Sequence, residues 1–182
     1  MITMLNGLDE INWSQLHHAY GEASDVPVLF RQLLSKDKVI VDKAIYELFG
    51  NIWHQGTVYE VSATAVPFLQ EILKSPEIDE QIKKSLACLL ASMADGYDTI
   101  DGSYVTATRT AVEKELRLLF SYLSCEVPVV RESVAGALSR YPQYATETLP
   151  MLEKALALES DEEAKEKITE AIETLKSQQA KL

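Results

Sequence analysis

One apolar spacing recurs along this chain and constrains its fold more than any other feature. From a first apolar residue, further apolar residues follow after four, three, one and three positions, which places all five side chains on one face of a helix. The copies are Val41, Ile45, Leu48, Phe49 and Ile52; Ile82, Leu86, Leu89, Leu90 and Met93; Val130, Val134, Ala137, Leu138 and Tyr141; and Ala164, Ile168, Ala171, Ile172 and Leu175. We therefore predict an amphipathic helix at each copy.

A second pattern precedes each copy by 14 to 16 residues. It consists of an aliphatic residue, a Pro and two Leu four positions apart, as at Val26-Pro27, Val66-Pro67 and Leu149-Pro150, with a degenerate copy that lacks the Pro at Glu113-Lys114. Pro suits the first turn of a helix, where its missing N–H has no intrahelical partner anyway. Each pair of patterns therefore predicts one helical hairpin.

The hairpins repeat at intervals of 40, 47 and 36 residues, close to the period of about 40–47 residues of two-helix repeats. Only seven Gly and six Pro interrupt the 182 residues, and no sustained alternation predicts strands. One hairpin cannot bury its own apolar face, so the copies must stack. We predict an all-α, right-handed α–α superhelix (solenoid) of about four hairpins.

The predicted boundaries make the chain a single domain over residues 1–182. An N-terminal cap covers 1–24 and contains a short helix after Asn12, because Asn is a preferred capping residue. The repeats lie at about 25–55, 60–95, 105–142 and 146–177. The turn-rich segment "DGYDTIDGSY", residues 95–104, accounts for the longest interval.

Part of the sequence resembles known repeat proteins. "VPVVRESVAGALSRY" resembles the second helix of a HEAT repeat, in which a Val-Arg pair, here Val130-Arg131, precedes small and aliphatic residues. The resemblance implies an ion pair from Arg131 to a neighbouring repeat, at a position where the other copies have Asp42, Lys83 and Lys165.

Two further segments extend the resemblance. "WSQLHHAYGEASDVP" and "HQGTVYEVSATAVPFL" resemble the opening of small bacterial HEAT-like proteins over roughly the first 70 residues. HEAT-like proteins mostly bind other proteins along a face lined by second helices, whereas some act on phycobilin chromophores and others on alkylated DNA. The resemblance thus implies a scaffold and leaves its activity open.

Charge and composition argue against several classes of function. Seventeen Lys and Arg stand against 28 Asp and Glu, a net charge of −11 that repels phosphate backbones and anionic membranes. No stretch approaches the ~20 apolar residues that span a bilayer. Two isolated cysteines, Cys88 and Cys125, are too few for a disulfide framework or thiolate metal site. We expect a cytoplasmic protein with free thiols, no cofactor or metal, and neither nucleic acid nor membrane as partner.

The break "FGNIWHQGTVYE", residues 49–60, predicts a candidate site. His54 and Asp95 each follow the last apolar member of their repeat by two positions, so neighbouring repeats should bring their loops to one edge. This would assemble a polar pocket with aromatic walls, suited to a small ligand or a cationic side chain. The predicted site residues are Trp53, His54, Gln55, Tyr59, Asp95, Tyr97, Asp98, Asp101 and Tyr104.

A purely structural alternative explains the same break. Gly56 can take the left-handed conformation that ends helices, His54 can cap late carbonyls, and Trp53 and Tyr59 can pack between repeats. An enzymatic role would use His54 as a general base, but the sequence marks neither a paired nucleophile nor a Gly-rich oxyanion turn.

Two other polar groups predict no metal site. The carboxylates of "DGYDTIDG" lack the alternate spacing of an EF-hand loop. His17 and His18, which we expect on one helix, would point about 100° apart and could not chelate together.

The leading hypothesis is a non-enzymatic module that binds a protein partner, a basic one, on the groove of the second helices. Tyr46, Lys84, Glu132 and Glu166 would contribute contacts there. A specific version is an immunity-type inhibitor of a cationic toxin domain, because an acidic surface accelerates association with a basic target. The alternative is a small-ligand-binding or lyase-like protein that uses the edge pocket around His54 and Asp95. The sequence identifies neither the partner nor an oligomeric state.

Overall fold

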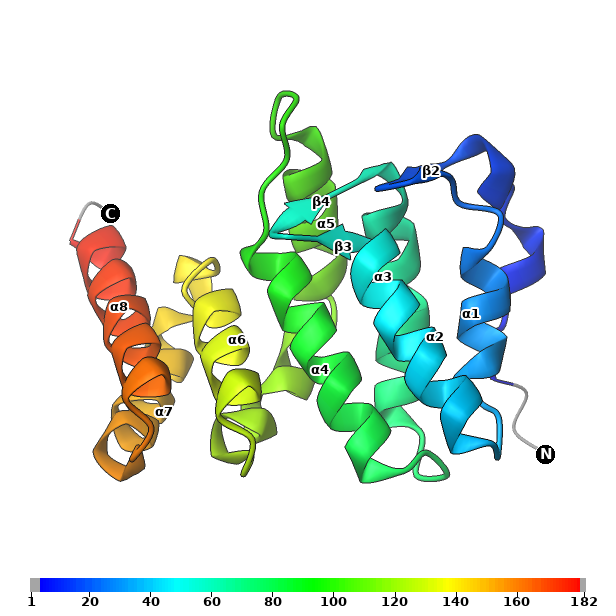
Figure 1. Cartoon of the computed structure of the whole chain (residues 1–182). Coiled ribbons are helices and arrows are strands. Elements are labelled where there is room, and N and C mark those ends of the chain that lie inside the picture. The colour runs from blue at the N-terminus through cyan, green and yellow to red at the C-terminus, as the bar shows by residue number, and fades with distance from the viewer. Residues whose placement is uncertain (1–3, 181–182) are drawn as a thin grey trace.

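The second helix of every hairpin lies in one layer of the molecule. We describe a computed structural model of the chain, in which residues 4–180 are placed. The layer contains α2 (Lys38–Asn51), α4 (Glu80–Asp95), α6 (Pro128–Leu138) and α8 (Glu162–Gln179), side by side in chain order (Figure 1). Nearly all residues of the recurring apolar spacing are buried along these helices; Ile45, Phe49 and Ile82 are half-buried. The predicted all-α solenoid is confirmed.

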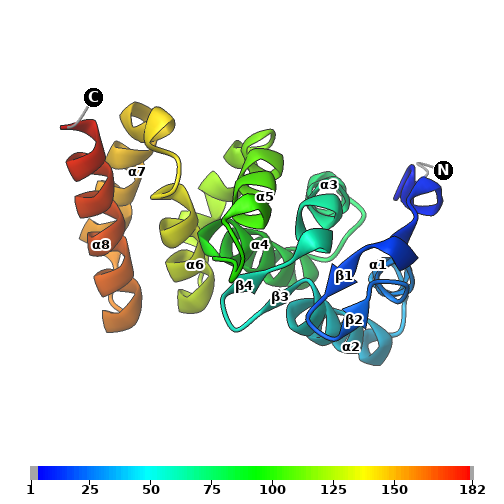
Figure 2. The ribbon, with the colours of Figure 1, turned by 90° about the horizontal axis from the view of Figure 1, so that it is seen from above.

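The first helices form a second layer behind the second helices (Figure 2). Along the chain they are α1 (Val26–Gln32), α3 (Glu60–Lys74), α5 (Ser103–Glu113) with the 3₁₀ helix η3 (Leu116–Ser124), and α7 (Ala145–Leu158). Each layer covers the apolar face of the other, which is why the hairpins are stable only as a row.

Capping residues define where the second helices begin. Asp37, Asp79 and Asp161 each accept a hydrogen bond from a backbone N–H in the first turn of α2, α4 and α8. Such caps satisfy N–H groups that have no intrahelical partner. The helix α6 instead has Pro128 in its first turn.

The prediction that Pro begins the first helices is correct only for α1. Pro67 and Pro150 lie inside α3 and α7, which begin seven and five residues earlier, at Glu60 and Ala145. At α3 the Tyr59 N–H donates to Ser62 Oγ at 2.7 Å, and at α7 the short 3₁₀ helix η4 (Pro142–Tyr144) leads into the first turn. The starts of α3 and α7 are therefore set by the residues that precede the apolar pattern, and not by its Pro.

The first helix of the third repeat is broken. α5 ends at Glu113, Glu115 adopts a non-helical conformation, and η3 continues as a tighter 3₁₀ helix. α5 packs against α3, whereas η3 packs against α6 and α7. The buried side chain of Gln70 donates to the carbonyls of Ala111 and Val112, at 3.2 Å each, where α5 ends. The break thus lets one first helix serve two neighbouring repeats.

The N-terminal cap differs from the expected helix. After Asn12 a helix does begin, but η2 (Trp13–Gln15) is a single 3₁₀ turn that follows η1 (Leu8–Glu10). The next residues form a hairpin, with β1 (His17–His18) antiparallel to β2 (Gly21–Glu22). The cap still covers the first repeat, because Trp13 is buried against Phe30 and Phe68.

Candidate functional site

The predicted break forms a β-hairpin between α2 and α3. Its strands, β3 (Trp53–His54) and β4 (Thr57–Val58), pair antiparallel around Gln55 and Gly56, whose φ angles are +49° and +91°. Positive φ at both turn residues is typical of the type I′ turn that matches strand twist. Gly56 is therefore left-handed as expected, but it closes a hairpin, because α2 has already ended at Asn51.

The hairpin is joined to the end of α4. The Val58 N–H donates to the Tyr97 carbonyl at 2.8 Å, and the Tyr97 N–H donates to the Gly56 carbonyl at 2.9 Å. The Tyr97 ring lies against Gly56, where a Cβ would come within 2.7 Å of it, and a Cβ at Gly96 would lie 2.9 Å from Val58. Figure 1 shows this joint at the upper edge, where the second helices end.

The N-terminal hairpin approaches the same edge. The Tyr20 hydroxyl lies 3.2 Å from Nδ1 of His54, and the two rings meet edge to face at 5.4 Å. Beneath them, His18 Nε2 lies 2.9 Å from an oxygen of Asp25, whose other oxygen accepts from Asn51 on α2. Tyr20 was not among the predicted site residues, because a short helix was expected after Asn12 where the structure has a β-hairpin.

We define the edge cluster as Tyr20, His54, Gln55, Tyr59 and Tyr97. Tyr20 is 68% exposed and Tyr97 is 55% exposed, so both rings face solvent, Tyr20 beside His54 and Tyr97 over Gly56. Burial raises the pKa of Tyr59, with a smaller contribution from the nearby Tyr20 and Tyr97 hydroxyls. The Tyr97 hydroxyl donates to the Gln55 carbonyl at 3.3 Å. The edge cluster is thus an exposed aromatic surface on a hydrogen-bonded frame.

Asp95 points away from His54, toward the third and fourth repeats. Its carboxylate accepts from Arg140 Nε at 2.6 Å and lies 3.5 Å from Lys167 Nζ on α8. It also lies over Gly136 of α6, where a Cβ would approach it to 2.6 Å. Asp95 therefore joins three second helices, and the structure does not pair it with His54.

A hollow beside this carboxylate brings together other predicted residues. It has a volume of about 320 Å³, and its lining includes Trp53, Asp95 and Tyr97 together with Glu132 and Lys167. Trp53 meets Phe49 edge to face at 6.1 Å, and its buried indole N–H has no hydrogen-bond partner within residues 4–180. Three of the predicted residues thus share a hollow on the second-helix side of the edge.

The remaining predicted residues organise the start of α5. Asp98 accepts backbone N–H bonds from Ile100, Gly102, Tyr104 and Val105, which lower the pKa of its carboxyl group. The Ser103 side chain, and then the Ser103 N–H, donate to Asp101 and lower the pKa of its carboxyl group. Both carboxylates are engaged with backbone, and Tyr104 packs against the core.

The second-helix face has a distinct charge pattern on its last two repeats. The pKa of Glu132 on α6 is raised, first by burial and then by the negative charges of Glu163 and Asp161. No cation of the described chain lies within ion-pair distance of Glu132, Glu163 or Glu166. We define these three residues as the acidic cluster.

The other residues expected on this face behave differently from one another. Tyr46 is 79% exposed on α2. Lys84 instead forms an ion pair with Glu126 of the next repeat, which raises the pKa of the lysine and lowers that of the glutamate. Lys84 thus links two repeats.

The Arg131 ion pair implied by the HEAT resemblance is present. Arg131 binds Glu159 through two bonds of 2.6 Å and donates a third, also 2.6 Å, to the Cys125 carbonyl. The equivalent Lys83 pairs with Glu80 of its own helix, and Asp42 with Lys38. Among these equivalent positions of the described chain, an ion pair to the neighbouring repeat therefore forms only at Arg131.

Some classes of site have no counterpart in the part of the chain that is placed. No group of three or more His, Cys, Asp and Glu residues there could hold a metal ion. No helix between residues 4 and 180 is long and apolar enough to cross a membrane. Cys88 and Cys125 are both buried free thiols.

Comparisons with known proteins identify the fold. No protein-family model matches the sequence, and no curated protein is significantly similar to it. Two engineered proteins solved by the Northeast Structural Genomics Consortium superpose with TM-scores of 0.59, at 23% and 24% identity over 85% of this chain. A designed armadillo repeat protein superposes with a TM-score of 0.58, at 19% identity over 82% of this chain.

These comparisons concern architecture alone. The chain spans 64% and 38% of the two engineered proteins and 63% of the designed armadillo repeat protein. At these identities the likeness shows a shared fold and no shared binding or activity. The chain folds as an α-solenoid of the HEAT and armadillo type.

Proposed function

We propose that the protein is a non-enzymatic interaction module that binds a basic protein partner on its second-helix face. Solenoids of this type present long surfaces to which partners bind. The observation that supports a basic partner is the acidic cluster, where Glu132 is half-buried beside Glu163 and no cation of the described residues lies within ion-pair distance. A cationic side chain placed there would relieve the repulsion and stabilise all three carboxylates in their charged form.

Charge makes the same partner favourable at long range. A net charge of −11 accelerates the approach of a cationic protein, and the rate should fall as salt screens the field. Tyr46, largely exposed on α2, supplies an aromatic contact of the kind enriched in interfaces. A specific form of the proposal is an immunity-type inhibitor whose partner is a cationic toxin domain.

The test compares two variants of equal charge. Glu132→Gln, Glu163→Gln and Glu166→Gln together remove the acidic cluster, whereas Glu10→Gln, Glu22→Gln and Glu77→Gln remove three exposed carboxylates elsewhere. Both variants have a net charge of −11 + 3 = −8. Affinity capture from the source cell, followed by binding measurements on the purified partner, should show binding by the wild type and the control.

The cluster variant should lose at least tenfold in affinity, because each desolvated charge pair contributes more than a solvent-exposed one. If both variants lost the same affinity for the partner, overall charge and not the acidic cluster would explain the binding. Absence of any partner captured by the wild type at low salt would contradict the proposal.

The edge cluster supports a second candidate function, the binding of a small cationic ligand. Tyr20 and Tyr97 present exposed rings on the same edge, and aromatic faces attract cations. Tyr20→Ala and Tyr97→Ala should then abolish binding of such a ligand while the acidic-cluster variant retains it. Retention of ligand binding by both tyrosine variants would eliminate this candidate.

A further inference from the structure

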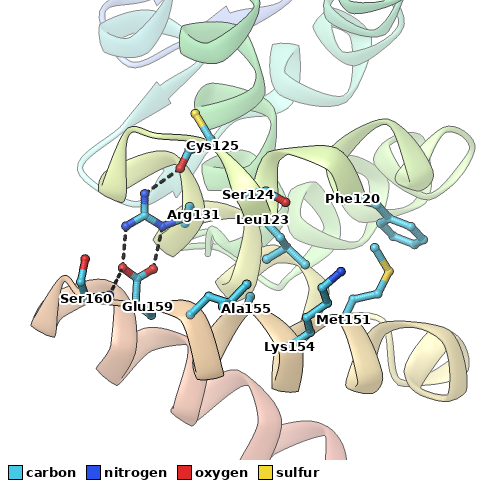
Figure 3. Close-up of a pocket in the computed structure, with 11 residues that line it drawn as sticks. Phe120, Leu123, Ser124, Cys125, Arg131, Met151, Lys154, Ala155, Glu159 and Ser160 are labelled. Carbon is cyan, nitrogen blue, oxygen red and sulfur yellow. Dashed lines mark hydrogen bonds and ion pairs between the residues drawn. The ribbon is translucent and has the colours of Figure 1, made fainter.

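A separate cavity lies on the other side of the row, between the first helices of the third and fourth repeats. It has a volume of about 430 Å³, within the range of about 300–1,000 Å³ typical of small-molecule sites. Figure 3 shows it between η3 and α7, with Arg131 and Glu159 at one end. None of its lining residues belongs to the edge cluster or the acidic cluster.

The walls of the cavity are largely apolar. Phe120 and Leu123 come from η3, and Met151, Ala155 and Leu158 from α7. Leu158 is 77% exposed, an unusual position for a large aliphatic side chain at the end of a helix. Apolar side chains that line a concave surface favour an occupant with an apolar body.

The polar groups at the end of the cavity already bind one another. Arg131 is bonded to both oxygens of Glu159 and to the Cys125 carbonyl, and Glu159 also accepts from the N–H groups of Ser160 and Asp161. In Figure 3 the Cys125 thiol points away from the cavity. The buried ion pair therefore closes the cavity without requiring a charged ligand.

Lys154 is the exception among the charged lining residues. Its ammonium group has no ion-pair partner between residues 4 and 180, and Figure 3 shows it pointing from α7 toward η3, across the cavity. The lining has two cations, Arg131 and Lys154, and one carboxylate, Glu159, a net charge of 2 − 1 = +1. This is opposite in sign to the chain as a whole, which has a net charge of −11.

We infer that this cavity binds an aliphatic monocarboxylate of medium chain length, with its hydrocarbon between η3 and α7 and its carboxylate at Lys154. A single uncompensated cation suits one anionic group, and apolar walls suit a hydrocarbon chain. A cationic ligand would meet like charge, and an uncharged one would gain no ion pair with the exposed Lys154 ammonium. The inference does not rest on the proposed protein partner, because no lining residue of the cavity belongs to the acidic cluster.

The experiment uses decanoate as the probe and the methionine methyl groups as reporters. Met151 lines the cavity and Met93 is buried in α4, so methyl NMR of the full chain contains a reporter and an internal control. Decanoate should shift the Met151 signal saturably and leave Met93 unchanged. Decanol, which lacks the charge, should bind roughly three- to tenfold more weakly.

Matched variants separate the charge from the apolar walls. Lys154→Gln should remove the preference for decanoate over decanol, whereas Lys165→Gln, an exposed lysine of α8, should retain it. Ala155→Phe should fill the cavity and abolish binding, whereas Ala157→Phe, exposed two residues further on α7, should leave it unchanged. Circular dichroism establishes that each variant is folded, and Lys154→Gln tests the charge whether or not Ala155→Phe folds.

Several results would overturn the inference. These are a Met151 signal unmoved by decanoate, equal binding of decanoate and decanol by the wild type, or unchanged binding in a folded Ala155→Phe. A peptide with a C-terminal Leu that shifts Met151 where decanoate does not would make a protein segment the occupant, and the small-molecule inference would be wrong.

Discussion

The first two repeats and the last two repeats are joined in different ways. Between repeats one and two the joint is made of backbone: a hairpin pairs with the chain after α4, and glycines let the segments approach. Between repeats three and four it is made of charge, because Arg131 reaches Glu159, whose side chain is only 2% exposed. A backbone joint leaves its side chains available to solvent, whereas a charged joint uses them inside the structure.

This difference bears on where each half can bind. The backbone joint presents the exposed rings of Tyr20, beside His54, and Tyr97, over Gly56. The charged joint instead has a cavity beside it and, on the second-helix face, carboxylates with no cation of the described residues within ion-pair distance. The following experiments test how strongly the two joints differ.

The largest effect should come from removing one partner of the charged joint. Arg131→Ala leaves the Glu159 carboxylate buried and unpaired, and we expect the free energy of unfolding to fall by about 3–5 kcal/mol in urea denaturation. Arg117→Ala, which breaks a solvent-exposed ion pair with Glu147, should reduce the free energy of unfolding far less. Equal losses in the two variants would mean that burial does not distinguish this joint.

Acid should weaken the same joint. The hydrogen bonds that Arg131 donates lower the pKa of Glu159 from 4.5 to about 2. The Glu159 carboxylate therefore has a lower pKa in the native state than in the unfolded state. The stability that this difference contributes is complete above pH 4.5 and is lost as the pH falls toward 2. The contribution should be about 3 kcal/mol. Urea denaturation between pH 2 and 5 measures it, and Glu159→Gln should show a smaller dependence on pH; an equal dependence would assign the loss to other carboxylates.

The backbone joint is tested by a pair of glycines. Gly56→Ala introduces a Cβ at φ +91° and 2.7 Å from the Tyr97 ring, and we expect a loss of about 2–3 kcal/mol in free energy of unfolding. Gly102→Ala meets the same type of backbone strain, at φ +83°, with no atom within 4 Å, and should cost about 1–2 kcal/mol. If the two variants were equally stable, contact with Tyr97 would contribute nothing to the joint.

Asp95 extends the charged joint toward the middle of the row. Asp95→Asn weakens its interactions with both Arg140 and Lys167, which are partly exposed, so the free energy of unfolding should fall by about 1 kcal/mol. Thermal unfolding at low and high salt measures the effect, which should shrink as salt screens the wild-type pairs. A salt-independent loss would point to packing over Gly136 as the main role of Asp95.

The smallest effect should come from His54. Its contact with the Tyr20 hydroxyl is solvent-exposed, so His54→Ala should change the free energy of unfolding by less than about 1 kcal/mol. A loss above about 2 kcal/mol in urea denaturation would make His54 a structural element of the edge, and the edge cluster would then be a joint in place of a binding surface.

The sequence predicted the helices well because a helix face has a period that can be counted. Val130, Val134 and Leu138 are spaced for one buried stripe, and they are buried. The hairpin at residues 53–58 has no such period, since each strand is two residues long, and its geometry depends on the φ angles of Gln55 and Gly56. A Gly two residues after a candidate His was the available signal for that turn.

The candidate site was predicted in part for the same reason. Repeat alignment brought the loops after α2 and α4 to one edge, where Thr57 and Tyr97 pair. It could not predict the direction of Asp95, because that depends on Arg140 and Lys167, which are distant in sequence. Tyr20 was missed because two short hairpins meet there, and neither leaves a pattern in the apolar residues.

The pairing of Thr57 with Tyr97 also separates the following turn from the row of repeats. Beyond Tyr97, the Asp98 carboxylate closes residues 98–105 by accepting backbone N–H bonds within the turn, and Ile100 at the tip is 70% exposed. A foreign peptide inserted after Ile100 would therefore emerge from a clamped base and leave the register of the helices unchanged. The protein offers a position for grafting an epitope or a fluorescent reporter at the edge of an otherwise regular scaffold.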